Sequence, residues 1–422
     1  MLTSFVAVFV AALDLAAEFA EPEDWKRPVD AFVSDRRADG FRFASDRHDI
    51  ANCLRRGAVT WNGLEVWEAK LYAENNVATR YELSMYNRGD DRDGRPLDAA
   101  ALKSLLARIA AAAEPNGVIG RQVEMRKLPS GGYRYERRFA KGADDVVLTW
   151  GVDSVKTKDQ TADYVRVTVR PKGAAKAKSA GVGVAKAKAR SNVSRNESGD
   201  VWIDSVPMVD QGQKGYCACA VAERVLRYYG KTVDEHEIAQ MAGTTAAGGT
   251  SFAEMVETVR KVGSKNRLGF QSVVTMSGSV KDIEKEVAQY NKHAKALKAP
   301  AIDMRAFTRG HVIMVGEIND QMRSDVILRM RTKDSRFKKF LSGVKMQIDK
   351  GIPVFWGVTL GKFPEPEIPQ ASGGHMRLII GYNAKAHTII YTDTWGAGHE
   401  RKSMPEDQAF AITHAAFALK PL

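Results

Sequence analysis

Residues 22–171 carry the hydrophobic pattern of short strands with one long helix between them. Runs of apolar and β-branched residues separated by polar turns are typical of strands. The expected strands are Leu64–Tyr72, Ala78–Tyr86, Tyr133–Phe139, Val146–Val152 and Tyr164–Val169. The Ala- and Leu-rich run Leu97–Ala113 predicts a helix, with Asp98 as its N-terminal cap. Because the strands do not alternate with helices, the pattern predicts an α+β domain with an antiparallel sheet.

Residues 200–422 show helical patterns first and strand patterns afterwards. The run from Cys217 to Tyr229 is apolar over most of its girth, which is typical of a buried helix, and Gly230 ends it. Further helices are expected at Val233–Ala239, Gly249–Arg260, Val280–Lys295 and Phe337–Lys350, and strands at Pro353–Val358, Met376–Tyr382 and Thr388–Thr392. The last two strands are expected to form a hairpin. Residues 296–335 have the appearance of an insertion with a strand at His311–Val315.

The stretch between these patterns, residues 172–199, has no hydrophobic period. From Lys172 to Arg195 it holds five Lys, two Arg and no acidic residue, and is otherwise mostly Ala, Gly, Ser and Val. This composition predicts a self-repelling, flexible linker between two domains. A tether to an anionic surface is the alternative interpretation.

The first twenty residues precede the first domain. An apolar run from Phe5 to Leu13 is followed by small residues, as in a signal peptide, but no basic residue precedes it. The run is too short to span a bilayer, and no transmembrane span is expected elsewhere. We expect residues 1–20 to lie outside both cores and the protein to be secreted or periplasmic. The alternatives are a short apolar helix packed on the first domain and a cytoplasmic location.

Composition limits the function classes. The chain of 422 residues, 44% hydrophobic and 27% charged, is long enough for two globular domains of ordinary size. Much of the net charge of +12 lies in the linker, so it does not predict specific nucleic-acid binding. The three cysteines, Cys53, Cys217 and Cys219, do not form the pattern of a disulfide framework, and one Cys-x-Cys is a weak zinc signal. No metal or cofactor is expected, and no feature predicts the oligomeric state.

Cys217 has the setting of a nucleophile. It opens the buried helix, where unpaired N–H groups and the helix dipole favour the thiolate over the thiol. Gln211 lies six residues upstream across a Gly-bearing turn. An amide placed there is positioned to donate a hydrogen bond to an oxyanion formed beside the sulfur.

The other half of this candidate site lies in the predicted hairpin. His375 begins one strand and Asp393 follows the next, so the hairpin is expected to bring the two side chains together. A nucleophilic thiol needs a base that takes and returns its proton, and the imidazole needs an acceptor that fixes its tautomer. Cys217, His375 and Asp393 supply these three roles.

The same residues carry a family resemblance. Gln211-Gly212 followed by Gly215-Tyr216-Cys217 at a helix start resembles the papain-like cysteine peptidases. The helix ending Tyr228-Tyr229-Gly230 and the later Gly374-His375, Gly381-Tyr382 and Asp393-Thr394-Trp395 resemble, more narrowly, the bacteriocin-leader-processing (double-glycine) peptidases.

The resemblance implies a papain-like fold for residues 200–422. It also implies hydrolysis of a peptide or protein substrate through a thioester intermediate. Three positions depart from the family pattern: Ala218 stands in place of the Trp of papain, and Cys219 and Thr394 stand in place of two Pro residues common in the narrower branch. None of these departures removes a catalytic group.

Two residues offer alternative assignments. His311 follows Arg309-Gly310 in a context like that of His375, but no second strand there ends in Asp-x-Trp. Cys219 lies about 200° around the helix from Cys217 and is expected to be a buried thiol. The alternative functions are amide hydrolysis or acyl transfer on a non-peptide substrate, and a papain-like scaffold without turnover.

Overall fold

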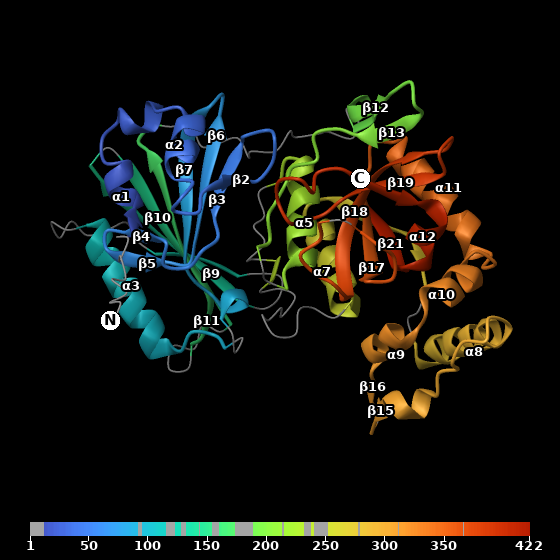
Figure 1. Ribbon diagram of the computed structural model, residues 1–422. Coiled ribbons are helices and arrows are strands. Elements are labelled where there is room, and N and C mark those ends of the chain that lie inside the picture. The colour runs from blue at the N-terminus through green and yellow to red at the C-terminus, as the bar shows by residue number, and fades with distance from the viewer. Residues whose placement is uncertain are drawn as a thin grey trace, which may run out of the picture. The chain divides into compact units, whose positions relative to one another are not determined.

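The computed structural model describes residues 12–91, 95–114, 123–127, 132–142, 144–153, 160–173, 189–212, 215–231, 238–239, 252–276, 279–310, 312–365 and 367–422. The chain divides near residue 180 into two compact units. Each unit combines helices with a mainly antiparallel sheet, which confirms the α+β fold class (Figure 1). Within the described ranges, no helix has the length and apolar character needed to cross a bilayer.

The first unit is built on an eight-stranded antiparallel sheet with the order β2-β3-β6-β7-β11-β10-β9-β8. Its strands are β2 (Arg42–Phe43), β3 (Ile50–Cys53), β6 (Glu68–Glu74), β7 (Val77–Asn87), β8 (Glu124–Lys127), β9 (Tyr133–Lys141), β10 (Asp144–Val152) and β11 (Ala162–Pro171). Helix α3 (Ala99–Ala113) is capped as predicted, because the Asp98 carboxylate accepts the Ala101 N–H at 2.8 Å. The single strand expected at Leu64–Tyr72 is two strands, since β5 (Leu64–Val66) belongs to a separate three-stranded sheet.

The N-terminal segment joins the core of the first unit from residue 13 onward. β1 (Leu13–Asp14) pairs in parallel with β4 (Val59–Trp61), and α1 (Leu15–Glu18) follows directly. Leu15 and Phe19 are fully buried. The expectation that residues 1–20 lie outside both cores is therefore wrong for this part of the segment, because its apolar side chains leave water by packing into that core. Residues 1–11 lie outside the described residues.

The second unit contains a sheet of the order β12-β13-β18-β17-β21-β14, to which β19 and β20 are added beside β18. The strands are β12 (Val193–Arg195), β13 (Asp200–Ile203), β14 (Leu268–Thr275), β17 (Val354–Leu360), β18 (Gly373–Asn383), β19 (Thr388–Thr392), β20 (Lys402–Pro405) and β21 (Thr413–Pro421). β18 and β19 form the predicted antiparallel hairpin, in which Leu378 pairs with Thr392.

Part of the predicted linker is an ordered edge of this sheet. β12 pairs with β13, Ala189 is buried, and the Arg195 guanidinium lies 2.8 Å from the Asp349 carboxylate. The expectation of a flexible linker over 172–199 is therefore wrong for residues 189–199, where strand pairing and this ion pair outweigh the basic, small-residue composition. Residues 174–188 lie outside the described residues.

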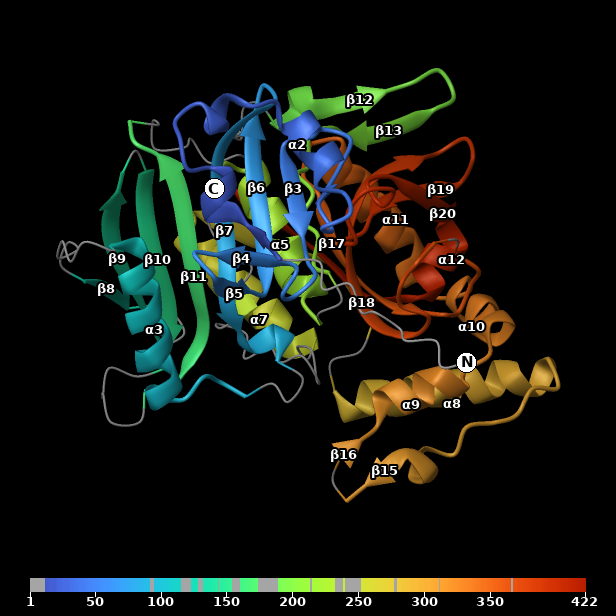
Figure 2. The same cartoon turned by 60° about the vertical axis from the view of Figure 1, so that its left-hand side comes forward.

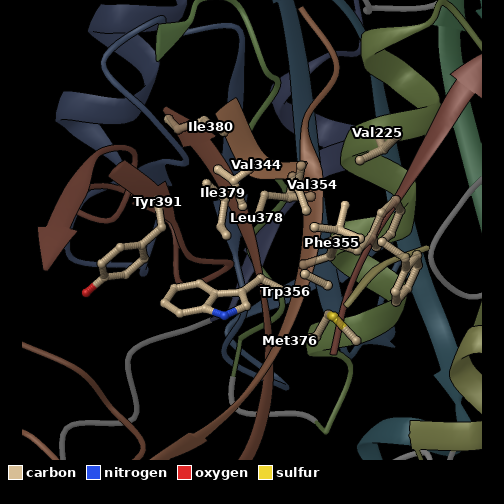
Figure 3. Close-up of a cluster of buried hydrophobic side chains, with 14 of the residues drawn as sticks. Val225, Val344, Val354, Phe355, Trp356, Met376, Leu378, Ile379, Ile380 and Tyr391 are labelled. Carbon is tan, nitrogen blue, oxygen red and sulfur yellow. The ribbon is translucent and has the colours of Figure 1, made fainter. Parts of the chain in front are cut away.

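Helices cover the sheet of the second unit. In Figure 1, α5 (Cys217–Tyr228) and α7 (Phe252–Lys265) lie on one side of the sheet, and α11 (Arg336–Ile348) and α12 (Glu406–Ala411) on the other. Val225 of α5 belongs to the same buried cluster as Trp356 and Leu378 of the sheet (Figure 3). Burial of each such side chain contributes roughly 1.5–3 kcal/mol, so the position of α5 against β18 is strongly specified.

A smaller helical part of the second unit has a core of its own. α8 (Val280–Ala296), α9 (Val315–Gln321) and α10 (Ser324–Arg331) pack around Tyr290 and Ile318, and both Figure 1 and Figure 2 show α8 beside α9. The strand expected at His311–Val315 is shorter, because β16 (Val312–Ile313) pairs only with β15 (Thr308–Arg309) and Val315 begins α9. Most of the helix expected at Val233–Ala239 lies outside the described residues.

Candidate active site

Cys217 is the first residue of α5 and is half-buried, whereas the helix from Ala218 to Tyr228 is fully buried. Burial by itself would raise the pKa of the Cys217 thiol. The interaction with His375, together with the backbone N–H groups of Met376 and Ala218, outweighs burial and lowers that pKa below its ordinary value. The local environment therefore favours the thiolate, as the position at a helix start predicts.

His375 and Asp393 meet across the β18–β19 hairpin. His375 is the third residue of β18, and Asp393 directly follows the last residue of β19. His375 Nε2 lies 3.0 Å from Asp393 Oδ1, and neither side chain is exposed to solvent. A carboxylate acceptor at Nε2 places the ring proton there, which leaves Nδ1 as the nitrogen that can take a proton.

The charges of this pair are strongly coupled. Burial alone would lower the pKa of His375, but Asp393 and Cys217 outweigh it and raise that pKa. For Asp393 the directions are reversed: burial would raise its pKa, but the hydrogen bond from His375 and the charge of Arg377 outweigh burial and lower it. Asp393 is therefore held as a carboxylate, and the His375 ring is biased towards its cationic form.

Gln211 lies against the end of the same hairpin. Its backbone N–H donates to the Thr394 carbonyl at 2.8 Å, and its side-chain Oε1 accepts a hydrogen bond from the Thr394 hydroxyl. Because the amide oxygen is engaged by a hydroxyl donor, the orientation of the whole amide is fixed. Thr394, one of the three positions that depart from the pattern of the resemblance, thus contacts the predicted oxyanion donor directly.

Three side chains contribute to the site but were not predicted: Trp395, which is half-buried, and Arg377 and Arg224, which are fully buried. The indole of Trp395 stacks on the His375 ring with centroids 4.3 Å apart and planes within 3°, which favours a cationic imidazole. Arg377 Nε donates to Asp393 Oδ1 at 2.8 Å. Arg224 of α5 donates to the carbonyl of Asp393 and, at 2.7 Å, to that of Pro207.

A sequence signal existed for two of these residues. Arg224 interrupts an otherwise apolar helix face, and Arg377 interrupts the apolar run of β18. A charged side chain in a buried element is rare unless it has a partner. The partners themselves were not predictable. Arg224 contacts Asp393, which is 169 residues away in sequence, and Arg377 contacts Glu365, which lies on a loop.

The alternative site residues differ in position from Cys217 and His375. Cys219 is fully buried in the core of the second unit, which confirms the expectation of a buried thiol. His311 lies outside the described residues.

Comparison with known proteins identifies the family of this chain. Residues 203–329 and 329–418 match the model of the Peptidase_C39 like family. No curated protein matches the chain. Among solved structures, the chain is similar to xylellain, a cysteine protease from Xylella fastidiosa, at 11% sequence identity and a TM-score of 0.27, over 56% of this chain and 88% of that chain. The matched residues run from 203 to 418, more than half of the 422 residues, so the chain belongs to the Peptidase_C39 like family.

Proposed function

We propose that the protein hydrolyses peptide bonds with Cys217 as nucleophile, His375 as base and acid, Asp393 as the orienting carboxylate and Gln211 as the oxyanion donor. The observation that carries this proposal is the buried 3.0 Å contact between His375 and Asp393, beside a thiol whose pKa is lowered by His375. Membership of a cysteine peptidase family supports the same chemistry.

In acylation, His375 holds the thiol proton and the Cys217 thiolate attacks the peptide carbonyl carbon. The carbonyl π electrons move to oxygen, where the Gln211 amide donates a hydrogen bond to the oxyanion. As the tetrahedral intermediate collapses, the C–N bond breaks and His375 gives its proton to the leaving amine. The products of this half are a free amine, a thioester on Cys217 and a neutral imidazole.

In deacylation, neutral His375 takes a proton from water, and the resulting hydroxide attacks the thioester carbon. Collapse breaks the C–S bond, releases the carboxylic acid product and returns the thiolate beside a protonated imidazole. Asp393 keeps a proton on Nε2 throughout, so that Nδ1 is the nitrogen that exchanges protons with sulfur, amine and water.

The proposal is tested by iodoacetamide alkylation and by peptide cleavage. We expect Cys217 to be alkylated faster than free cysteine below pH 7, and we expect a peptide library to be cleaved by untreated but not by alkylated protein. Cleavage in ¹⁸O-labelled water places the label in the new carboxyl group if the reaction is hydrolysis, and transfer to an added amine leaves the product unlabelled. A Cys217 that reacts like free cysteine, with no cleavage of any peptide, would support a scaffold role instead.

A further inference from the structure

Arg377 brings a fully buried cation to the carboxylate that His375 uses. Its Nε donates to Asp393 Oδ1 at 2.8 Å, and His375 Nε2 lies 3.0 Å from that same oxygen. Asp393 Oδ2 is buried and has no hydrogen-bond partner in the part of the chain that the structure describes. The carboxylate therefore contacts both the imidazole and the guanidinium through a single oxygen atom.

Arg377 has a second anionic neighbour on its far side. Its Nη1 lies 2.7 Å from Glu365 Oε2, and the Glu365 side chain is only 6% exposed. The Tyr391 hydroxyl donates to the same Glu365 oxygen at 2.7 Å, and the guanidinium lies 4.7 Å from the centre of the Tyr391 ring. The position and the charge of Arg377 are thus fixed by groups outside the proposed triad.

Packing does not explain a charge at this position. Ile379, the next residue of β18 on the same face of the strand, is apolar and fully buried, and Arg377 is fully buried as well. A buried ion pair often stabilises a fold no better than apolar residues of similar volume, because both charges must leave water. The charge at Arg377 is therefore better explained by its contact with Asp393 than by the stability of the sheet.

We propose that Arg377 is a positioning residue that holds the Asp393 carboxylate against His375, an inference that rests on the proposed function. Together with the opposite charge of Glu365, Arg377 sets the electrostatic field at Cys217 and His375. The cation keeps Asp393 ionised and favours the Cys217 thiolate, but it also opposes the imidazolium form of His375. Glu365 has the opposite effect on each group. The two residues together fix the pH range in which thiolate and imidazolium coexist.

The charged and titratable groups around Cys217 and His375 come from several elements. They are Cys217 and Arg224 of α5, Arg377 of β18, Tyr391 of β19, Asp393, His399 and Glu400 after β19, and Glu365 between β17 and β18. Of these, Arg377 and Glu365 can be neutralised without removing a group that the proposed reaction uses or one that anchors α5. They are therefore the residues to vary.

The test is the pH dependence of Cys217 alkylation by iodoacetamide, followed by mass spectrometry of the peptide that contains Cys217. In Glu365→Gln the charge of Arg377 is uncompensated, so the acidic limb of the rate profile is expected at lower pH. In Arg377→Met the charge of Glu365 is uncompensated, so the limb is expected at higher pH. Each shift is expected to reach about half a pH unit, roughly threefold in rate at a fixed pH on that limb.

Two further variants complete the design. The double variant Arg377→Met/Glu365→Gln restores the net charge and is expected to lie between the single variants. Glu317→Gln makes the same charge change at an exposed ion pair with Arg309 and is expected to keep the wild-type profile. A general loss of structure would move both single variants in the same direction, so shifts of opposite sign separate a charge effect from misfolding.

The inference is overturned if Glu365→Gln has the wild-type profile while wild-type Cys217 reacts faster than free cysteine. Shifts of equal sign in the two single variants overturn it as well. If Arg377→Met does not fold, the Glu365→Gln shift alone decides. Failure of the proposed function gives a different result, because the wild-type Cys217 itself would then follow the profile of a free thiol.

Discussion

Cys217 and Cys219 lie two positions apart on one helix and differ in the properties that nucleophilic attack requires. Cys217 is half-buried at the helix start, beside His375 and two backbone N–H groups that lower its pKa. Cys219 is fully buried in the core. At the scale of the single residue, the environment of each thiol is therefore decided by the face of the helix on which it lies.

Replacing either member of the Cys–His pair is expected to abolish peptide cleavage. Cys217→Ala removes the nucleophile and His375→Ala removes the only described base beside it, so the residual rate is expected to fall to the background of buffer. Cys219→Ala, a matched thiol deletion, is expected to keep most of the activity. Cleavage rates measured on one peptide found in the library check this, and an inactive Cys219→Ala with an active Cys217→Ala would reverse the assignment.

Gln211→Ala is expected to slow the chemical step by about a hundred- to a thousandfold, the usual effect of losing one oxyanion donor. Alkylation of Cys217 by iodoacetamide forms no oxyanion, so its rate is expected to remain at the wild-type value. Single-turnover cleavage and alkylation kinetics on the same protein check the two halves of this prediction. An equal loss in both measurements would mean that Gln211 supports the thiolate rather than the oxyanion.

At the scale of secondary-structure elements, the site depends on how α5 is attached to the end of β19. Arg224 is fully buried, and it donates to the carbonyls of Pro207 and Asp393 and to the Thr392 hydroxyl. Burial lowers the pKa of Arg224 to about 9, which remains above neutrality. One cation therefore joins the chain before α5, the helix itself and Asp393, the residue proposed to orient His375.

Arg224→Met is expected to lower the free energy of unfolding by about 1–3 kcal/mol for each buried acceptor left without a partner. Urea denaturation, with cleavage measured in parallel, checks this prediction. Arg305→Met is the control, because the Arg305 side chain is 91% exposed and its loss is expected to change the unfolding free energy by no more than about 0.5 kcal/mol. Equal effects of the two substitutions would show that Arg224 does not join these elements.

At the scale of the whole molecule, the chain is two compact units with a basic stretch between them. The lysines of that stretch lie at residues 172–188, ahead of η3 (Arg190–Asn192) and β12. Arg195, the last basic residue of the segment, is paired in β12 and bonded to Asp349. The exposure expected from composition therefore stays a prediction for residues 174–188 alone.

Limited digestion with trypsin is expected to cut first between Lys172 and Ala189, because five lysines lie there in a stretch of composition typical of linkers. Intact-mass analysis of the early fragments checks this prediction, and a fragment that begins at Ala189 or just before it is the expected product. Cuts inside β12, α5 or the sheet that precede cuts in this stretch would contradict it.

The sequence by itself determined the elements and the identity of the candidate groups. Local period and capping predicted α3, α5, α11 and the β18–β19 hairpin, because burial of one face and satisfaction of helix ends are properties of neighbouring residues. The motifs around Cys217 and His375 determined the family resemblance, because a motif is also a property of neighbouring residues. Local composition failed for residues 13–19 and 189–199. The pairing of β1 with β4 decides the structure of the first segment, and the pairing of β12 with β13 and the contact of Arg195 with Asp349 decide that of the second.

Only the tertiary structure decided which contacts shift the pKa values of those groups. The partners of Arg377 lie on a loop and at the end of the next strand, and the Thr394 hydroxyl reaches Gln211 across 183 positions of sequence. Such contacts depend on where packing places separate segments, and no local period records that. The physical reason is that the Coulomb and hydrogen-bond energies which set the charge of Cys217 and His375 depend on distances in space and on burial, and both are properties of the folded chain.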